Sequence, residues 1–145
     1  MSDQTHPRTL MADFDRQMAA ADSSDDVTRV LERWLHEDYV RHDAMGRLDR
    51  AEWIRTYTEL LLAFPDLFTA NVITLAEDDW LAHKWSATGQ HTATYFGVPP
   101  TRRRVNAAGI TLTRFSDGRI LEEHSSWSKA DVMHALAIIP ISALG

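Results

Sequence analysis

Hydrophobic residues in the first half of the chain recur at the spacing of helices. Leu10, Phe14 and Met18 lie four residues apart and predict an amphipathic helix from about residue 8 to residue 21. The polar segment DSSDD interrupts this pattern, and Ser24 is expected to be the N-cap of a second helix. The second helix is predicted from hydrophobic residues at helical spacing, which are Val27, Val30, Leu31, Trp34 and Leu35.

A third helix is predicted between Asp49 and Pro65. Asp49 is expected to cap it, since Glu52, three residues later, completes a capping box, and Pro65 ends it. Residues 36–48, which precede this helix, are polar and form either an irregular connection or a short strand. The hydrophobic positions of the third helix are Trp53, Ile54, Tyr57, Leu60, Leu61 and Phe64.

Beyond Pro65 the hydrophobic residues follow the pattern of strands. Residues 67–76 and 80–96 predict one hairpin around the turn EDD, and residues 105–115 and 119–127 predict a second around SDG. The segment GVPPTRRR between the hairpins is a predicted loop, and residues 129–137 form a short final helix. Helices followed by a meander of strands predict an α+β fold, with helices covering one face of an antiparallel sheet.

Length, composition and charge limit the number of domains and the partners that this chain can have. The 145 residues are enough for one domain, and we expect residues 1–7 to be a disordered tip and residues 8–145 a single domain. Hydrophobic residues make up 44% of the chain, and the net charge of −6 argues against nucleic acid or an anionic membrane as partner. The start of the chain lacks the apolar core of a signal peptide, and no apolar run approaches the length of a bilayer span, so we expect a cytoplasmic protein. Because the chain has no cysteine, it has no thiolate metal ligand.

The last predicted strand is unusually polar, with two glutamates, a histidine and two serines, and a third serine, Ser128, follows it. If SDG is a three-residue loop with a left-handed glycine, Phe115 pairs with Arg119; a two-residue loop would shift the pairing. The first face of the hairpin then holds Ile110, Leu112, Arg114, Glu122, His124, Ser126 and Ser128. The other face holds Thr111, Thr113, Phe115, Leu121, Glu123, Ser125 and Trp127. The first face combines apolar area with a few polar groups, which is typical of a pocket wall, although a solvated face carrying ion pairs has the same composition.

Four motifs resemble a known family. They are FPDL (residues 64–67), GxHT (89–92), GVPPT (97–101) and RFxDGRI (114–120). At this spacing the chain resembles the SnoaL-like polyketide cyclases over residues 8–136, within the superfamily of nuclear transport factor 2 and ketosteroid isomerase.

The resemblance implies a cone-shaped barrel, in which a curved antiparallel sheet packs with three N-terminal helices around a deep apolar pocket. It implies ring closure of a polycyclic polyketide ester by an aldol reaction, with no metal and no organic cofactor. The expected partners are therefore a small hydrophobic substrate and a second copy of the chain. The family usually forms homodimers through the outer surface of the sheet, where Trp127, Phe115 and Thr113 are expected to lie.

The family's catalytic residues are changed in this chain. The family's last strand reads E-x-W-x-x-x-D, and here His124 stands at the tryptophan position and Ser128 at that of the catalytic aspartate. The family's catalytic histidine aligns with Arg114, while His42 aligns with a water-binding asparagine of related epoxide hydrolases. We therefore predict His124, His42 and Arg114 as the catalytic groups, because imidazoles titrate near neutral pH and a guanidinium polarises a carbonyl.

The predicted substrate-binding residues are Trp53, Tyr57, Phe64, Trp85, His91, Leu112, Glu122, Ser126 and Ser128. Structural roles compete with these: Ser128 is also a suitable N-cap for the last helix, and Asp131 a suitable first-turn acid. His83 is expected at the surface. Three functions remain open at this point: a cyclase or isomerase, an epoxide hydrolase or hydratase that uses a pocket water, and a non-catalytic binding or assembly subunit.

Overall fold

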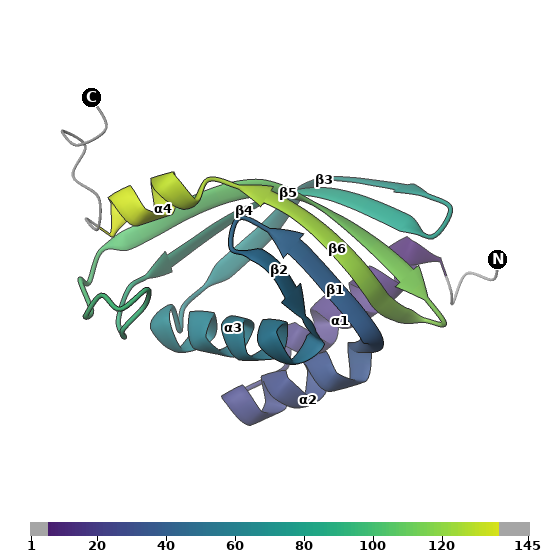
Figure 1. The fold of residues 1–145 in the computed structure, drawn as a ribbon, viewed down its shortest axis with the longest axis horizontal. Coiled ribbons are helices and arrows are strands. Elements are labelled where there is room, and N and C mark those ends of the chain that lie inside the picture. Colours follow the sequence, from purple (N-terminus) through teal and green to yellow (C-terminus); the bar gives the residue numbers. More distant parts are fainter. Residues whose placement is uncertain (1–5, 137–145) are drawn as a thin grey trace.

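Three helices lie beneath a strongly curved sheet, and a short fourth helix follows the last strand at one end of the sheet (Figure 1). The structure, a computed structural model, describes residues 6–136. The elements are α1 (Pro7–Ala19), α2 (Ser24–Trp34), β1 (Leu35–Asp43), β2 (Gly46–Asp49), α3 (Arg50–Ala63), β3 (Phe68–Glu77), β4 (Trp80–Gln90), β5 (Arg104–Ser116), β6 (Arg119–Trp127) and α4 (Lys129–Ala135). The predicted α+β fold class is confirmed.

The sheet is open and mixed. Its strand order is β2-β1-β6-β5-β4-β3, and every neighbouring pair is antiparallel except β1 and β6, which are parallel. The expectation of a purely antiparallel sheet is therefore wrong at one pair. The parallel pair arises from the polar segment 36–48, which forms most of a β1–β2 hairpin. This hairpin joins the sheet beside β6.

Helix caps fix where α1, α2 and α3 begin. The predicted capping box at α3 is confirmed, with the Asp49 side chain accepting from the Glu52 N–H and the Glu52 side chain accepting from the Asp49 N–H. The N-cap of α2 is Ser23 instead of Ser24, since the Ser23 hydroxyl accepts from the Asp26 N–H. At α1 the His6 side chain caps the helix and Pro7 lies in its first turn, so these two residues belong to the fold. The rest of the predicted tip, residues 1–5, lies outside the described residues.

The turn between β5 and β6 differs from the predicted one. Ser116 pairs with Arg119, so the loop has two residues, Asp117 and Gly118, whose φ angles of 54° and 75° correspond to a type I′ turn. The predicted pairing of Phe115 with Arg119 is therefore wrong. A bulge in β6 at Leu121 shifts the register again, so that Arg114 pairs with Glu122. This register differs by two residues from the predicted one, which leaves the two sets of side chains on opposite faces as expected.

The main core lies between the helices and one half of the concave face of the sheet. Leu31 of α2 is 1% exposed and Leu35 of β1 is fully buried, and both belong to the cluster that joins α1 and α2 to the sheet. A second cluster, around Phe64 and Leu136, covers the other end, next to α4. Among the helices of residues 6–136, none is long and apolar enough to cross a bilayer.

Candidate functional site

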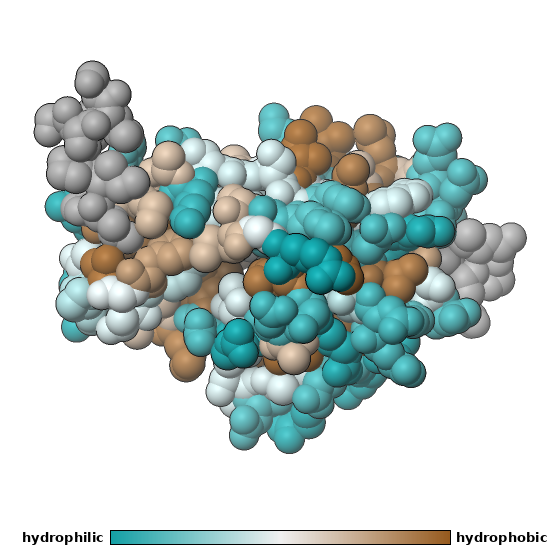
Figure 2. Space-filling view, in the orientation of Figure 1, coloured by the Kyte–Doolittle hydropathy of each residue, from teal (hydrophilic) through white to brown (hydrophobic). Residues whose placement is uncertain are grey.

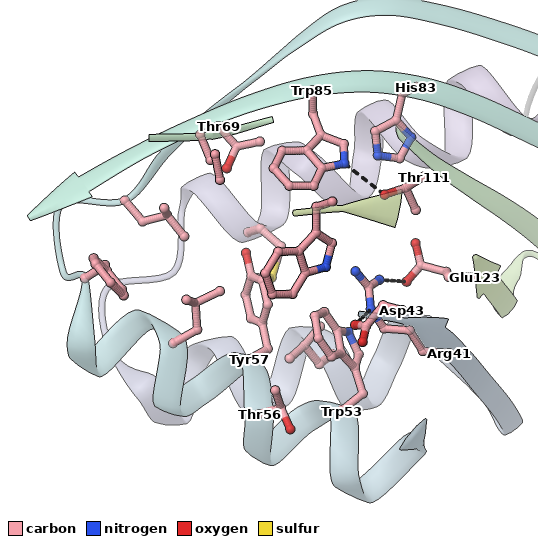
Figure 3. A pocket seen from close by; sticks show the side chains of 18 of the residues that line it. Arg41, Asp43, Trp53, Thr56, Tyr57, Thr69, His83, Trp85, Thr111 and Glu123 are labelled. Carbon is pink, nitrogen blue, oxygen red and sulfur yellow. Dashed lines mark hydrogen bonds and ion pairs between the residues drawn. The ribbon is translucent and has the colours of Figure 1, made fainter. Parts of the chain in front are cut away.

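A cavity of about 310 Å³ lies between the concave face of the sheet and the helices. In Figure 3, His83 and Trp85 project from β4 toward Trp53 and Tyr57, which project from α3. Most of the wall is hydrophobic, and Trp127 of β6 adds another indole. A cavity of this size with mostly apolar walls and a few polar groups is typical of a site for a small organic molecule.

Cross-strand packing holds Trp85 in place. Its indole Nε1–H donates to the Thr111 hydroxyl at 3.0 Å. Its ring lies over Gly109, where an added Cβ would come within 2.6 Å of the indole and 2.5 Å of the Ser126 carbonyl. A glycine at position 109 is therefore required for the indole to lie flat against β5 and shape the cavity wall.

A buried network of charged and polar side chains forms one side of the cavity. The Glu123 carboxylate accepts from the Tyr39 hydroxyl at 2.7 Å, from the Thr113 hydroxyl at 2.8 Å and from Arg41 Nη1 at 3.2 Å. Arg41 Nε also donates to Asp43 at 2.8 Å, and the guanidinium lies 3.9 Å from the Trp53 ring centre. The side chains of Arg41, Glu123 and Asp43 are 10%, 11% and 2% exposed, so these charges are largely removed from water.

The network fixes its own protonation states. Burial is the largest single effect and acts to lower the pKa of Arg41, but Glu123, Tyr39 and Asp43 together outweigh it, and the pKa is raised above the usual value. Burial, followed by the charge of Glu123, raises the pKa of Tyr39 well above its usual value. Arg41 therefore stays charged, and Tyr39 stays a protonated hydrogen-bond donor to Glu123.

Asp15 of α1 lines the cavity without a partner. Asp15 is partly exposed to solvent, and it also contributes to the wall of the cavity. Within residues 6–136 no hydrogen bond or ion pair engages its carboxylate. Burial raises the pKa of Asp15, and the negative charge of Glu123 raises it further. Tyr57, which also lines the cavity, has its pKa raised by burial first and then by the charge of Asp15, so its phenol remains protonated.

His83 of β4 is a second titratable group in the cavity wall. Burial is the main cause that lowers its pKa from the usual 6.5; Arg41 lowers it further, against an opposing contribution from Glu123. Its Nδ1 is buried without a hydrogen-bond partner in the described part of the chain. A neutral imidazole at neutral pH is therefore expected here. The expectation that His83 lies at the surface is wrong.

The lowered pKa of His83 predicts a specific dependence of stability on pH. The unfolded chain binds the proton more tightly than the folded protein, so the contribution of His83 is present above pH 6.5 and is lost as the pH falls below it through the folded pKa. We expect the free energy of unfolding of the wild type, relative to His83→Gln, to decrease as the pH falls below 6.5. Urea unfolding at a series of pH values measures this difference.

Lys84→Gln, on the opposite face of the same strand, is the matched control, and its difference from the wild type should stay level over the same range. A level difference for His83→Gln as well would show that the imidazole is not held neutral by burial.

The three predicted catalytic residues come together, but on the outer face of the sheet. The His124 ring stacks on His42, with ring centres 4.8 Å apart, and its Nε2 lies 3.2 Å from Glu122. Glu122 also pairs with Arg114 at 3.3 Å, and Arg114 pairs with Asp79 at 2.9 Å. His124 and His42 are exposed, and none of the three lines the cavity. Their predicted placement on the pocket face is therefore wrong, because that face of the hairpin is the solvated one.

The predicted substrate-binding residues divide between the two faces. The four aromatic ones, Trp53, Tyr57, Phe64 and Trp85, line the cavity, and their contact with a ligand stays a prediction. The residues away from the cavity are Leu112, Glu122 and Ser126 on the outer face, Ser128, which caps α4, and His91, which is fully buried. The His91 Nδ1 accepts from the Thr101 N–H at 3.1 Å, which gives this histidine a structural role in holding the loop before β5.

The cavity residues that sequence reasoning missed carried a readable signal. Asp15 lies four residues after Met11 and next to Phe14, so it is an acidic residue on the hydrophobic stripe of α1. In the hairpin, the inward face holds Phe115 and Trp127 and a single charge, Glu123, whereas the outward face holds three ionisable groups. The number of charges on a face, more than the mixture of its residue types, indicates which face is solvated.

A curved open sheet, three helices on its concave side and an apolar cavity between them define the nuclear transport factor 2-like fold. Within that class the chain belongs to the SnoaL-like polyketide cyclase family, whose model matches residues 12–136.

Several solved structures share the fold. AclR from Streptomyces galilaeus, an inferred hydroxylase, is 25% identical, with a TM-score of 0.76 over 92% of this chain and 99% of that one. IdmH from Streptomyces antibioticus, an inferred polyketide cyclase, is 24% identical, with a TM-score of 0.68 over 87% of this chain and 97% of that one. An inferred SnoaL-like polyketide cyclase from Jannaschia sp. CCS1 is 18% identical, with a TM-score of 0.76 over 97% and 98%. No curated protein matches the sequence.

Proposed function

We propose that the protein is a cyclase or isomerase that acts on an apolar, oxygenated molecule of the polyketide type. The observation that carries this proposal is the unpaired Asp15 carboxylate in the wall of an aromatic cavity, with its pKa raised by burial. Such a carboxylate is a stronger base than one in water, and bases poised closer to neutral pH are effective in general acid–base catalysis.

The residues of the cavity suit a ring closure in which the proton that is removed from the substrate is later returned to it. Asp15 takes the proton alpha to a carbonyl, and the Tyr57 phenol donates a hydrogen bond to the enolate oxygen that forms. The carbanion then attacks a second carbonyl carbon of the same molecule, which forms the new C–C bond and leaves an alkoxide. Asp15 returns its proton to that alkoxide. The sequence is redox-neutral and needs no co-reactant.

The first half of this reaction can be tested without the natural substrate. We expect the protein to accelerate exchange of the alpha proton of a naphthyl β-keto ester in D₂O, measured by NMR as loss of the C–H signal. Exchange at the rate of buffer alone would contradict the proposal. A second incubation, in ¹⁸O-labelled water, separates ring closure from the hydrolase or hydratase alternative, because label appears in the product only when water adds to carbon.

We also propose a homodimer that forms through the outer face of the sheet. The residues first expected there are interior: Phe115 is 4% exposed, Thr113 is fully buried, and Trp127 lines the cavity. The outer face instead carries an apolar patch on β3 and β5, and Figure 2 shows hydrophobic side chains along the upper edge of the molecule, where the sheet lies. The patch residues are Ile73, Leu75, Ile110 and Leu112, which are 52%, 63%, 51% and 42% exposed. Exposed apolar patches of this kind mark association surfaces.

Leu112→Glu should therefore convert a dimer into a monomer, because it places a negative charge among the apolar side chains of the patch. Light scattering coupled to size-exclusion chromatography measures the mass of both proteins at equal concentration. Leu62→Glu on α3, an equally apolar residue that is 59% exposed, is the matched control and should remain dimeric. A monomeric wild type would contradict this use of the patch.

A further inference from the structure

The charges that line the cavity do not balance. Three carboxylates, those of Asp15, Asp43 and Glu123, face one cation, since Arg41 is the single lysine or arginine in the cavity wall within residues 6–136. Arg41 is already engaged by Asp43 and Glu123. The cavity is therefore a poor place for a second anion, and it has no free cation to receive a carboxylate group.

The aromatic wall is suited to a positive charge. One cation is already held in this way, with the Arg41 guanidinium 3.9 Å from the centre of the Trp53 ring. The Trp53 and Tyr57 rings lie 5.5 Å apart on α3, and Tyr57 is close enough to Asp15 for the carboxylate to affect its pKa. An aromatic ring and an unpaired carboxylate in one apolar space are the two features that recognise an ammonium group.

From these observations we infer that the cavity selects aromatic molecules that carry a protonated amine, and that the amine binds beside Asp15. This inference rests on the proposed function, because it takes the cavity to be the reaction site. It adds that the substrate carries a positive charge. Burial and Glu123 both disfavour the negative charge of Asp15, and a ligand cation offsets both effects. Binding of the amine therefore stabilises Asp15 in its ionised form, as a base. An amine attached next to the carbonyl also acidifies the C–H that the base removes.

Three anthracene probes that differ in charge test the inference: 2-(aminomethyl)anthracene, 2-(hydroxymethyl)anthracene and anthracene-2-carboxylate. We expect the amine to bind at least tenfold more tightly than the alcohol, and the carboxylate to bind most weakly, by fluorescence titration at neutral pH. Asp15→Asn should remove the preference for the amine over the alcohol and leave the alcohol's affinity unchanged.

Asp13→Asn is the control, because Asp13 lies on the same helix and pairs with Arg16. It should leave all three affinities as in the wild type. Equal affinity for amine and alcohol, a preference that survives Asp15→Asn, or no binding of any probe would overturn the inference. This test measures ligand affinity, whereas the test of the proposed reaction measures proton exchange. Alcohol binding without preference for the amine therefore leaves the proposed reaction standing, and amine preference without exchange contradicts only the reaction.

Discussion

Replacing Asp15 by asparagine is expected to lower alpha-proton exchange, and turnover of a natural substrate, by a factor of at least about 100. Removal of a positioned general base typically costs about 10²–10⁴ in rate. Asparagine fills the same volume and keeps an acceptor oxygen, but it takes up no proton. The loss should therefore appear in the rate of the chemical step, with little change in the affinity of an uncharged ligand.

The same substitution should raise stability at neutral pH. Because the folded pKa of Asp15 is raised, the folded protein binds this proton more tightly than the unfolded chain, and ionisation of Asp15 above that pKa opposes folding. Asparagine does not ionise, so the urea midpoint of Asp15→Asn should exceed that of the wild type at pH 7. Asp13→Asn should change neither rate nor midpoint in this way. A variant of Asp15 that is both fully active and no more stable would remove the residue from the mechanism.

Sequence periodicity was sufficient for the three N-terminal helices and for the two hairpins β3–β4 and β5–β6. The spacing of Leu10, Phe14 and Met18 reports a helix because a 3.6-residue period places them on one face, and α1 covers these residues. The two hairpins were recognisable from turn residues between alternating segments. The position of the β1–β2 hairpin was not recognisable, since residues 36–48 are polar and their pairing with β6 is a contact between segments more than 80 residues apart.

The direction in which each face points could not be taken from the turn alone. The two-residue turn by itself would exchange the two faces of the β5–β6 hairpin. The bulge at Leu121 reverses this exchange, and neither the turn length nor the bulge is determined by composition. The face with the more reactive side chains resembles a pocket wall in sequence, but it is the solvated face in the structure. Polar groups inside a fold are tolerated when they are mutually satisfied, as Glu123 is by three donors, and such pairing between distant residues is invisible in one sequence.

The same network accounts for the shape of the site. Arg41 joins β1 to β6 through Glu123 and to α3 through the Trp53 ring, so it fixes the distance between the sheet and the helix that carries Tyr57. The exposed cluster of His42, Glu122, His124 and Arg114 has no comparable role, because its members lie on the outer face. The geometry of the cavity therefore depends on side chains to which the proposed reaction assigns no proton transfer.

Arg41→Met should consequently destabilise the protein by about 3–5 kcal/mol, the cost of removing one member of a buried ion pair. Methionine occupies similar space, but it leaves Glu123 and Asp43 buried near each other without a counter-charge. Urea unfolding at pH 7 measures the loss. The deficit should shrink at acid pH, where protonated carboxyl groups no longer need a cation.

Arg114→Met is the matched control, since Arg114 also pairs with two carboxylates, those of Asp79 and Glu122, but its side chain is 42% exposed. Ion pairs in contact with water contribute about 0–1 kcal/mol, so this variant should lose no more than that. The difference between the two arginines isolates burial as the cause, because the number of partners is the same. Equal losses for both variants would mean that the Arg41 network does not hold the sheet and α3 in register around the cavity.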